Sequence, residues 1–248
     1  MRVAALYDIH GNLPALEAVL DEVHAAAVDL LVIGGDILPG PMASDVLQIL
    51  QAIDPPAHFI RGNCEHAMLD ERAAPGSAKV PEHVRAALQW AGAQFSADEL
   101  TEIASWPATL HVDIPHLGDV LFCHATPRDD NEIFTKLTPE ARVAPAFDGV
   151  ASPMAVCGHT HMPFDRRIGS IRVVNAGSVG MPFGEPGAYW LLLGPNLEFR
   201  RTRYDLERAA ARIRATTYPQ ADEFADTSVL RPPSETHMLE LFGGDDTH

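Results

Sequence analysis

The sequence has few cysteines and no long hydrophobic run. Its 248 residues include three cysteines, Cys64, Cys123 and Cys157, and no CxxC pair. An odd, unpaired set argues against a disulfide framework and favours a reducing compartment, so we expect a cytoplasmic protein. The longest apolar stretches, residues 30–33 and 189–193, are strand-sized and far short of the ~18 residues of a membrane span. The first twelve residues lack the hydrophobic segment of a secretory signal, so we expect neither export nor a membrane partner.

Basic residues are also scarce. The chain has 18 Lys and Arg against 34 Asp and Glu, which gives a net charge of −16. Such a surface repels the phosphate backbone, so long nucleic acid is excluded as a partner. A small phosphate ligand is compatible with this charge, because bound metal ions reverse the field locally. Residues 221–248 carry seven acidic side chains and one basic one, Arg231.

The apolar residues predict strands alternating with helices in the first third of the chain. Residues 2–7, 29–33 and 58–61 form short apolar runs, and helical periodicity follows the first two. This strand–helix–strand order favours parallel pairing. Residues 66–106 predict further helices, and Ser96 and Glu99 form a capping-box pattern.

From Thr109 onward the pattern predicts mainly short strands, with helices over 139–147 and 205–215. We expect strands at 109–114, 119–124, 154–157, 164–168, 171–175, 187–193 and 197–204. The sum is an α/β fold of two sheets packed face to face with helices outside. We assign residues 1–215 to one domain with a helical insertion at about 66–106, and residues 216–248 to an acidic C-terminal appendage.

Five short polar segments each follow a predicted strand, where loops of an α/β sheet converge. Each is a weak signal alone: Asp8 could cap a helix, and Gly35-Asp36 is common turn chemistry. Together they place seven nitrogen and oxygen donors in one order, which favours a shared site. These donors are Asp8, His10, Asp36, Asn63, His124, His159 and His161. The glycines beside them allow tight turns and close approach to a ligand.

The ordered pattern D-x-H, G-D, G-N, H and G-H-x-H resembles the calcineurin-like metallophosphoesterase superfamily, in particular its compact bacterial phosphodiesterase-type branch. The resemblance spans about residues 1–204 and includes the segment Asn175–Gly180 (NAGSVG), similar to the family's N-P-G-S-V-G. It implies a four-layer α-β-β-α sandwich of two mixed sheets. It also implies a dinuclear metal-dependent phosphoesterase that hydrolyses phosphodiesters by attack of a metal-bound hydroxide. Monoesters are left open as further substrates.

The resemblance also implies a role for each donor. Asp8, His10 and His161 are expected to hold one metal ion, Asn63, His124 and His159 the second, and Asp36 to bridge both. Asp36, Asn63, Cys64 and His124 are the expected catalytic residues, and Asn12 and Asn63 the expected substrate-binding residues. Mixed oxygen and imidazole ligands suit two divalent transition-metal ions drawn from Mn, Fe, Ni, Zn or Co. Asn175 and Ser178 are expected to orient ligands.

Cys64 departs from the family pattern, which has a histidine near the leaving group. A thiol is a poor general acid, so our hypothesis is a preference for diesters with acidic leaving groups, or protonation by His66 or water. The alternative is a packed thiol beside the site. Asn12 is either a phosphate donor or a helix N-cap. Cys123 is expected to point into the core.

The sequence leaves other functions open. One alternative is a protein phosphatase or dinucleoside polyphosphate hydrolase of the same superfamily. Another is a catalytically silent metal-binding scaffold. The expected partner is a small phosphate-ester or nucleotide-like substrate, and an oligomer is compatible with the sequence.

Overall fold

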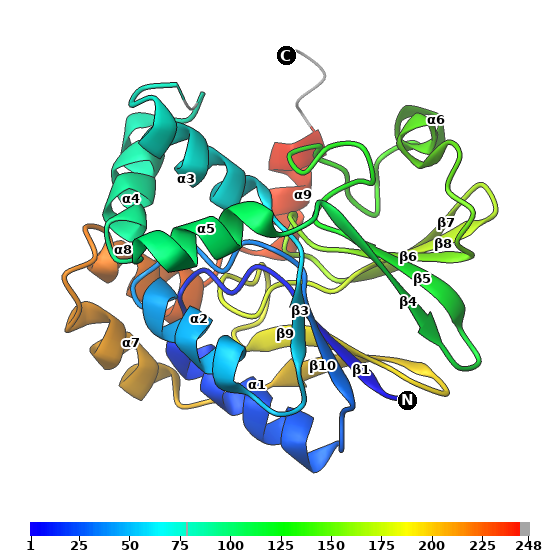
Figure 1. Ribbon diagram of the computed structural model, residues 1–248, viewed down its shortest axis with the longest axis horizontal. Coiled ribbons are helices and arrows are strands. Elements are labelled where there is room, and N and C mark those ends of the chain that lie inside the picture. Colours follow the sequence, from blue (N-terminus) through cyan, green and yellow to red (C-terminus); the bar gives the residue numbers. More distant parts are fainter. Residues whose placement is uncertain (78, 244–248) are drawn as a thin grey trace.

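The computed structural model describes residues 1–77 and 79–243, which form two five-stranded mixed sheets flanked by helices in α-β-β-α order (Figure 1). This is the fold that the sequence predicted. The first sheet has the order β10-β9-β1-β2-β3. Its strands are β1 (Val3–Leu6), β2 (Leu30–Ile33), β3 (Ala57–Phe59), β9 (Ala188–Leu193) and β10 (Leu197–Thr202).

In this first sheet β1, β2 and β3 are parallel, as the strand–helix alternation predicted, while β9 and β10 are antiparallel to their neighbours. The connecting helices are α1 (Leu13–Ala25) and α2 (Ala43–Ala52). The second sheet has the order β4-β5-β6-β8-β7, with β5, β6 and β8 parallel. Its strands are β4 (Thr109–Ile114), β5 (Gly118–Cys123), β6 (Met154–Cys157), β7 (Phe164–Ile168) and β8 (Ile171–Asn175).

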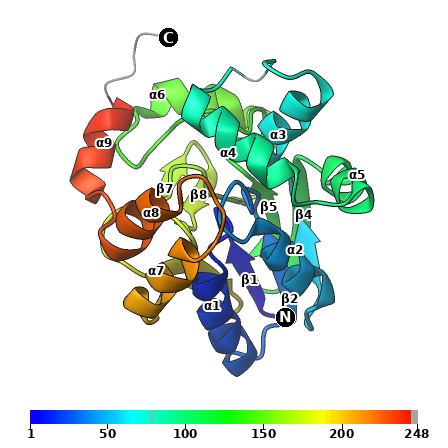
Figure 2. The same cartoon turned by 90° about the vertical axis from the view of Figure 1, so that its left-hand side faces the viewer.

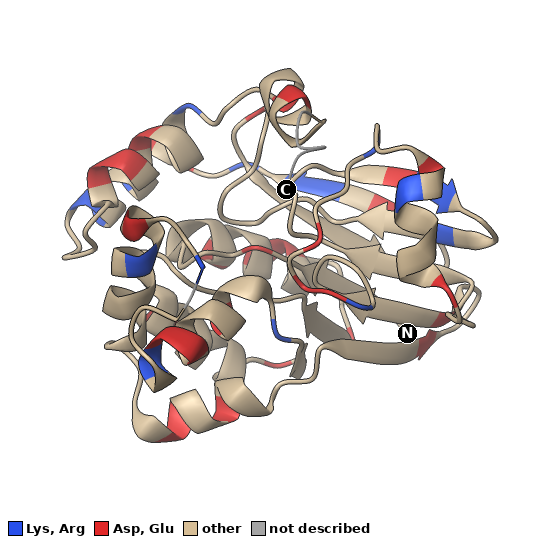
Figure 3. Cartoon of the chain, turned by 90° about the horizontal axis from the view of Figure 1, so that it is seen from above, with Lys and Arg blue, Asp and Glu red and all other residues tan. Residues whose placement is uncertain are grey.

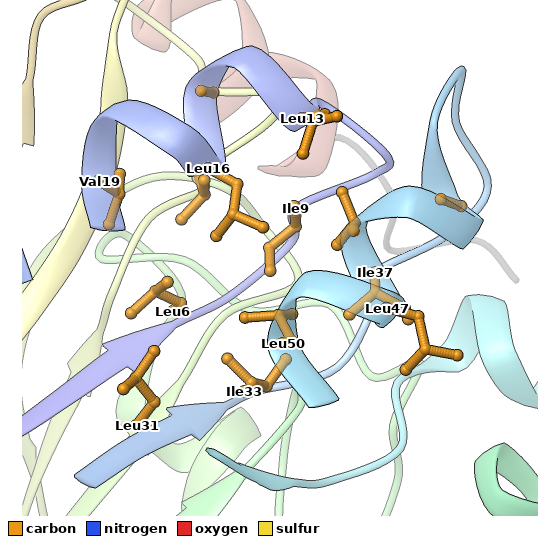
Figure 4. Packing of buried hydrophobic residues seen from close by; sticks show 14 of the residues in the cluster. Leu6, Ile9, Leu13, Leu16, Val19, Leu31, Ile33, Ile37, Leu47 and Leu50 are labelled. Carbon is orange, nitrogen blue, oxygen red and sulfur yellow. The ribbon is translucent and has the colours of Figure 1, made fainter. Parts of the chain in front are cut away.

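Strand β1 is buried on both faces, which explains its unbroken apolar sequence. Val3 and Ala5 pack toward the second sheet in a cluster with Phe122. Ala4 and Leu6 pack on the opposite face, in the cluster that α1 and α2 complete (Figure 4). Because side chains alternate along the strand, β1 contacts the second sheet with one face and the outer helices with the other.

Helices α3 (Asn63–Ala73), α4 (Glu82–Gly92) and α5 (Ala97–Ser105) follow β3. The predicted capping box is present at α5, where Ser96 and Glu99 exchange hydrogen bonds. The predicted helix over 139–147 is divided into α6 (Glu140–Val143) and a 3₁₀ turn, Ala144–Phe147. Pro145 explains the change, because it has no N–H to continue the α-helical ladder.

The C-terminal segment begins beside α4, where Tyr218 and Gln220 contact that helix. The Tyr218 ring lies edge-on to Trp90, with 5.2 Å between centroids, and Gln220 Nε2 donates to the His83 carbonyl at 2.8 Å. This region contains α8 (Ala221–Phe224), a π-helical turn (225–230) and α9 (Glu235–Gly243), and it follows α7 (Leu206–Arg214). Figure 2 shows α4, α7 and α8 around the end of β1.

Acidic residues recur along the covering helices (Figure 3). Among the residues that the structure describes, no helix has both the length and the apolar character that a membrane crossing needs.

Leu6 gives a direct test of the outer core layer. Its side chain is fully buried against α1 and α2, so Leu6→Ala should lower the free energy of unfolding by about 2–5 kcal/mol. Leu137→Ala is the control, because Leu137 is 67% exposed and should change it by less than about 0.5 kcal/mol. Urea unfolding followed by circular dichroism measures both, and equal losses would contradict the packing described.

Candidate metal centre

All seven predicted donors lie where the carboxyl ends of the parallel strands meet. The loops after β1, β2, β5 and β6 and the start of α3 bring them together. The loop after β1 carries Asp8 and His10, the loop after β2 carries Asp36, α3 begins at Asn63, His124 follows β5, and His159 and His161 follow β6.

Five of these residues have a left-handed backbone. The φ angles are 53° at Asp8, 45° at His10, 54° at Asp36, 64° at His159 and 57° at His161. This conformation is uncommon for residues other than glycine and costs free energy, so the surrounding structure must enforce it. Backbone strain of this kind concentrates at functional sites, and here it coincides with the predicted donors.

Asp8, His10 and His161 form one compact group, with one ligand atom of each within 4.8 Å of the others. His161 Nε2 lies 3.3 Å from His10 Nε2 and 3.4 Å from Asp8 Oδ1. His161 Nδ1 is 2.7 Å from the Met181 carbonyl, to which it donates, so the Nε2 lone pair faces the group. Phe183 stacks on the outer side of the His161 ring, with 5.1 Å between centroids.

A second group gathers around His124. Its Nε2 lies 2.9 Å from Asn63 Oδ1 and 3.5 Å from Asp36 Oδ2. Its Nδ1 donates to the Gly34 carbonyl at 2.8 Å, which turns Nε2 toward the acidic side chains. The His159 ring lies edge-on to His124, with 5.2 Å between centroids.

Buried polar atoms of the donors, among them Asp8 Oδ1 and His159 Nε2, have no hydrogen-bond partner within the described chain. Buried polar atoms are nearly always paired, so unpaired ones need a physical reason. Carboxylate oxygens and imidazole nitrogens that converge without donors between them fit divalent cations. The residues present therefore fit the metal ions that the sequence implied.

The pKa shifts reflect the same crowding of charge. Burial lowers the pKa of His124, but Asp36 and Asp8 outweigh it and raise the pKa to about 10. Burial and the neighbouring His124 lower the pKa of His159 to about 4. Without metal, protons on histidine compensate the two buried carboxylates, and cations that bind there would displace these protons.

Glu65 has a role that the sequence did not reveal. Its buried carboxylate accepts hydrogen bonds from the backbone N–H groups of Asp36, Ile37 and Gly62, each at 2.8 Å. It therefore ties the loop that carries Asp36 to the start of α3, where Asn63 lies. The only signal in the sequence was an acidic residue in the third position of the helix, where such bonds to the cap are common.

Two glycines permit the close packing of these loops, as expected from the sequence. A Cβ atom at Gly62 would lie 2.2 Å from Asp36 Oδ1, and one at Gly158 would lie 2.5 Å from Asp8 Oδ2. Any other residue would therefore displace a candidate ligand.

The structure favours the N-cap interpretation of Asn12 over that of a phosphate donor. Its side chain is fully buried. Oδ1 accepts from Ala15 N at the start of α1, and Nδ2 donates to the Gly180 carbonyl. Both ends of the amide are engaged inside the protein, which favours a structural role for Asn12.

The NAGSVG segment, residues 175–180, holds the loops that carry Asp8 and His161 through hydrogen bonds. Ser178 Oγ donates to the Asp8 carbonyl and accepts from Met181 N, both at 2.7 Å. Met181 in turn accepts the hydrogen bond from His161. Asn175 Nδ2 donates to Thr160 Oγ1 at 3.2 Å, in the loop between the two histidines after β6.

Cys64 lies at the site, whereas the other two cysteines do not. Cys64 Sγ is within 4.8 Å of ligand atoms of His10 and Asp36. Burial and the Asp36 carboxylate raise the pKa of the thiol well above its usual value, so it stays protonated. Cys123 and Cys157 are buried in the core cluster behind the second sheet, which confirms the interpretation of Cys123.

Comparison with known proteins is consistent with this site. A model of the calcineurin-like phosphoesterase superfamily domain matches residues 1–193. An uncharacterized protein of Methanocaldococcus jannaschii is 24% identical over 238 residues, covering 88% of this chain and 94% of that protein.

Two solved structures are similar over nearly their whole length. A hypothetical protein of Pyrococcus horikoshii has a TM-score of 0.78 at 20% identity, covering 94% of this chain and 99% of that one. A metallophosphoesterase of Sphaerobacter thermophilus has a TM-score of 0.72 at 25% identity, covering 92% and 99%.

Glu65→Gln should destabilise the metal-free protein by about 1–3 kcal/mol, because an amide cannot accept all of these buried N–H groups. The matched control is Glu99→Gln, in the exposed capping box of α5, with an expected loss below about 0.5 kcal/mol. Urea unfolding in the presence of a chelator compares the two. If Glu65→Gln were as stable as the wild type, Glu65 would not hold the Asp36 loop.

Proposed function

The chain belongs to the calcineurin-like phosphoesterase superfamily, and we propose that it is a dinuclear metal-dependent enzyme that hydrolyses small phosphodiesters. One observation carries the dinuclear assignment: Asp36 Oδ2 faces one histidine of each ligand group. It lies 3.5 Å from His124 Nε2 and 3.9 Å from His10 Nε2. A carboxylate in that position suits a bridge between two cations.

The donors divide into two sets around this bridge. Asp8, His10 and His161 would hold one ion with Asp36, and Asn63, His124 and His159 would hold the other. When bound, such ions act as Lewis acids that neutralise phosphate charge and lower the pKa of water. Oxygen and imidazole donors suit Mn, Fe, Co, Ni or Zn.

The protein's own contribution is to orient these donors and to leave the site attractive to an anion. Gly34 and Met181 accept hydrogen bonds from His124 and His161 and so select the tautomer that faces the ions. Asn63 and the neutral histidines add no charge, so two carboxylates against two divalent ions leave about +2 locally. That field would attract a phosphate ester despite the acidic exterior.

The strained backbone and the unpaired buried donors favour a chain that binds metal ions. A catalytically silent metal-binding scaffold shares these features, so hydrolysis is the property that separates it from an enzyme. A phosphatase for proteins or dinucleoside polyphosphates remains the alternative within the family. The free cysteines fit the cytoplasmic location that we propose for the chain.

Metal removal and restoration test the proposal. Chelated protein should be inactive, and one of Mn, Fe, Co, Ni or Zn should restore hydrolysis of bis-p-nitrophenyl phosphate at a higher kcat/KM than that of p-nitrophenyl phosphate. Asp36→Asn should lower kcat by about 10³-fold, because loss of the bridge removes several kcal/mol of transition-state stabilisation.

Asp21→Asn is the control, because Asp21 is an exposed residue of α1 and should keep full activity. Full activity of Asp36→Asn would refute the bridging role. Hydrolysis that survives complete metal removal would refute the proposed function, and a preference for phosphopeptides or dinucleoside polyphosphates would favour the alternative.

The thiol of Cys64 predicts that the rate of hydrolysis depends on the acidity of the leaving group. A protonated thiol with a raised pKa donates its proton poorly, so phenyl esters should react at least about 100-fold more slowly than p-nitrophenyl esters. Cys64→His should reduce this ratio by supplying an imidazole. Cys64→Ala, which removes the thiol without adding an acid, should leave the ratio unchanged. An unchanged ratio in Cys64→His would show that leaving-group protonation does not depend on this position.

A further inference from the structure

A cavity of about 250 Å³ opens directly beside the candidate metal centre. His10 and Cys64 line it at the metal centre, and both belong to one group of close ligand atoms with Asp36. Its other walls come from α4 and from the C-terminal segment 218–228. Any group in this cavity therefore lies within reach of a phosphate held at the centre. We call it the α4 cavity.

The walls of the α4 cavity are mainly apolar. They include Pro39, Val84, Ala87, Met181 and Phe224. A volume of about 250 Å³ is just below the ~300–1,000 Å³ range of sites for drug-sized ligands. The cavity thus suits one compact organic group, such as a single aromatic ring, rather than a peptide segment.

Three of the polar side chains in these walls, Tyr218, Gln220 and Thr227, are engaged with the protein itself. Tyr218 Oη lies 3.3 Å from Gln220 Oε1, to which it donates, and Gln220 Nε2 donates to the His83 carbonyl. Thr227 Oγ1 donates to the Glu223 carbonyl at 2.8 Å. Recognition in the cavity would therefore rest mainly on apolar contact.

Charge limits the occupant further. Among the described residues that line the α4 cavity there is no Lys or Arg, and the exposed Glu223 carboxylate lies at its wall. Away from the metal centre, an anionic group would meet the Glu223 carboxylate with no Lys or Arg in the described lining to compensate it. A second phosphate, as in a polyphosphate, does not fit this environment.

A different hollow, of about 350 Å³, borders the centre at Asn63. Its lining includes His66, Asp70, Lys79 and Asp130, so it is polar and charged. Within the part of the chain that the structure describes, the two hollows share no lining residue. The contrast assigns an apolar substituent to the His10 side and not to the Asn63 side.

We propose that the α4 cavity binds one organic substituent of the phosphoester substrate, and that this substituent is compact, largely apolar and not anionic. This inference rests on the proposed function and narrows its substrate class. It disfavours phosphoproteins and dinucleoside polyphosphates. It also gives the C-terminal segment 218–228 a role in specificity, since that segment supplies one wall.

Competitive inhibition of the metal-restored enzyme tests the proposal, with bis-p-nitrophenyl phosphate as substrate. Phenylphosphonate should inhibit with a Ki at least about tenfold below those of methylphosphonate and phosphonoacetate, because only its ring is buried in the cavity. Val84→Trp fills the cavity and should raise the Ki of phenylphosphonate at least about tenfold. The Ki of methylphosphonate, which has no ring, should stay within about twofold.

Ala86→Trp is the matched control, because Ala86 is exposed on the same helix and does not line the cavity. Thr227→Trp fills the cavity from the opposite wall and should act as Val84→Trp does, which guards against a folding defect at α4. The proposal would be overturned if Val84→Trp raised the Ki of phenylphosphonate no more than Ala86→Trp does and Thr227→Trp left this Ki unchanged.

A gain of binding tests the charge argument. Glu223→Lys should lower the Ki of phosphonoacetate by about tenfold, whereas Asp222→Lys, exposed but outside the lining, should not. Equal responses to the two substitutions would contradict a role of Glu223 in the cavity. A wild type that hydrolyses the substrate but does not prefer phenylphosphonate refutes this inference alone, whereas no hydrolysis with any metal refutes the proposed function itself.

Discussion

Two carboxylates, Asp8 and Asp36, are buried where the parallel strands end, and their charge must be compensated there. An uncompensated buried charge is so costly that a protein either neutralises it or pairs it. Here the partners are histidines, and His124 carries a raised pKa because both carboxylates lie near it. Divalent cations would satisfy the same carboxylates and leave the histidines neutral, as ligands. The loop conformations, the histidine tautomers and the glycines around the site all follow from the need to compensate these two buried charges.

The fold meets this condition by aligning strand ends from two sheets. Parallel pairing of β1 with β2 and of β5 with β6 brings four loops to one edge of the sandwich. The loops then adopt left-handed conformations at the donors, at a cost that the packed layers beneath offset. Glu65 and Ser178 secure the loops through backbone hydrogen bonds, so the positions of the candidate ligands depend on residues outside the ligand set.

The sequence predicted the parts of the structure that local patterns encode. Apolar runs predicted β1 and β2. The polar segments after the predicted strands indicated that Asp8, Asp36 and His159 lie close together. The role of Glu65 was not predictable, because it depends on where the loop after β2 lies in space. Nor was the α4 cavity, since Val84 and Phe224 meet only through packing between segments 140 residues apart. Asn12 fitted two roles locally, and only its burial distinguishes them.

The most direct measurement is anomalous X-ray diffraction from crystals of the protein grown with manganese. The account predicts two peaks about 3.5–4 Å apart, both within coordination distance of Asp36. One peak should lie among Asp8, His10 and His161, and the other among Asn63, His124 and His159. A single peak, or peaks away from Asp36, would contradict the claim that two buried carboxylates organise a paired metal centre.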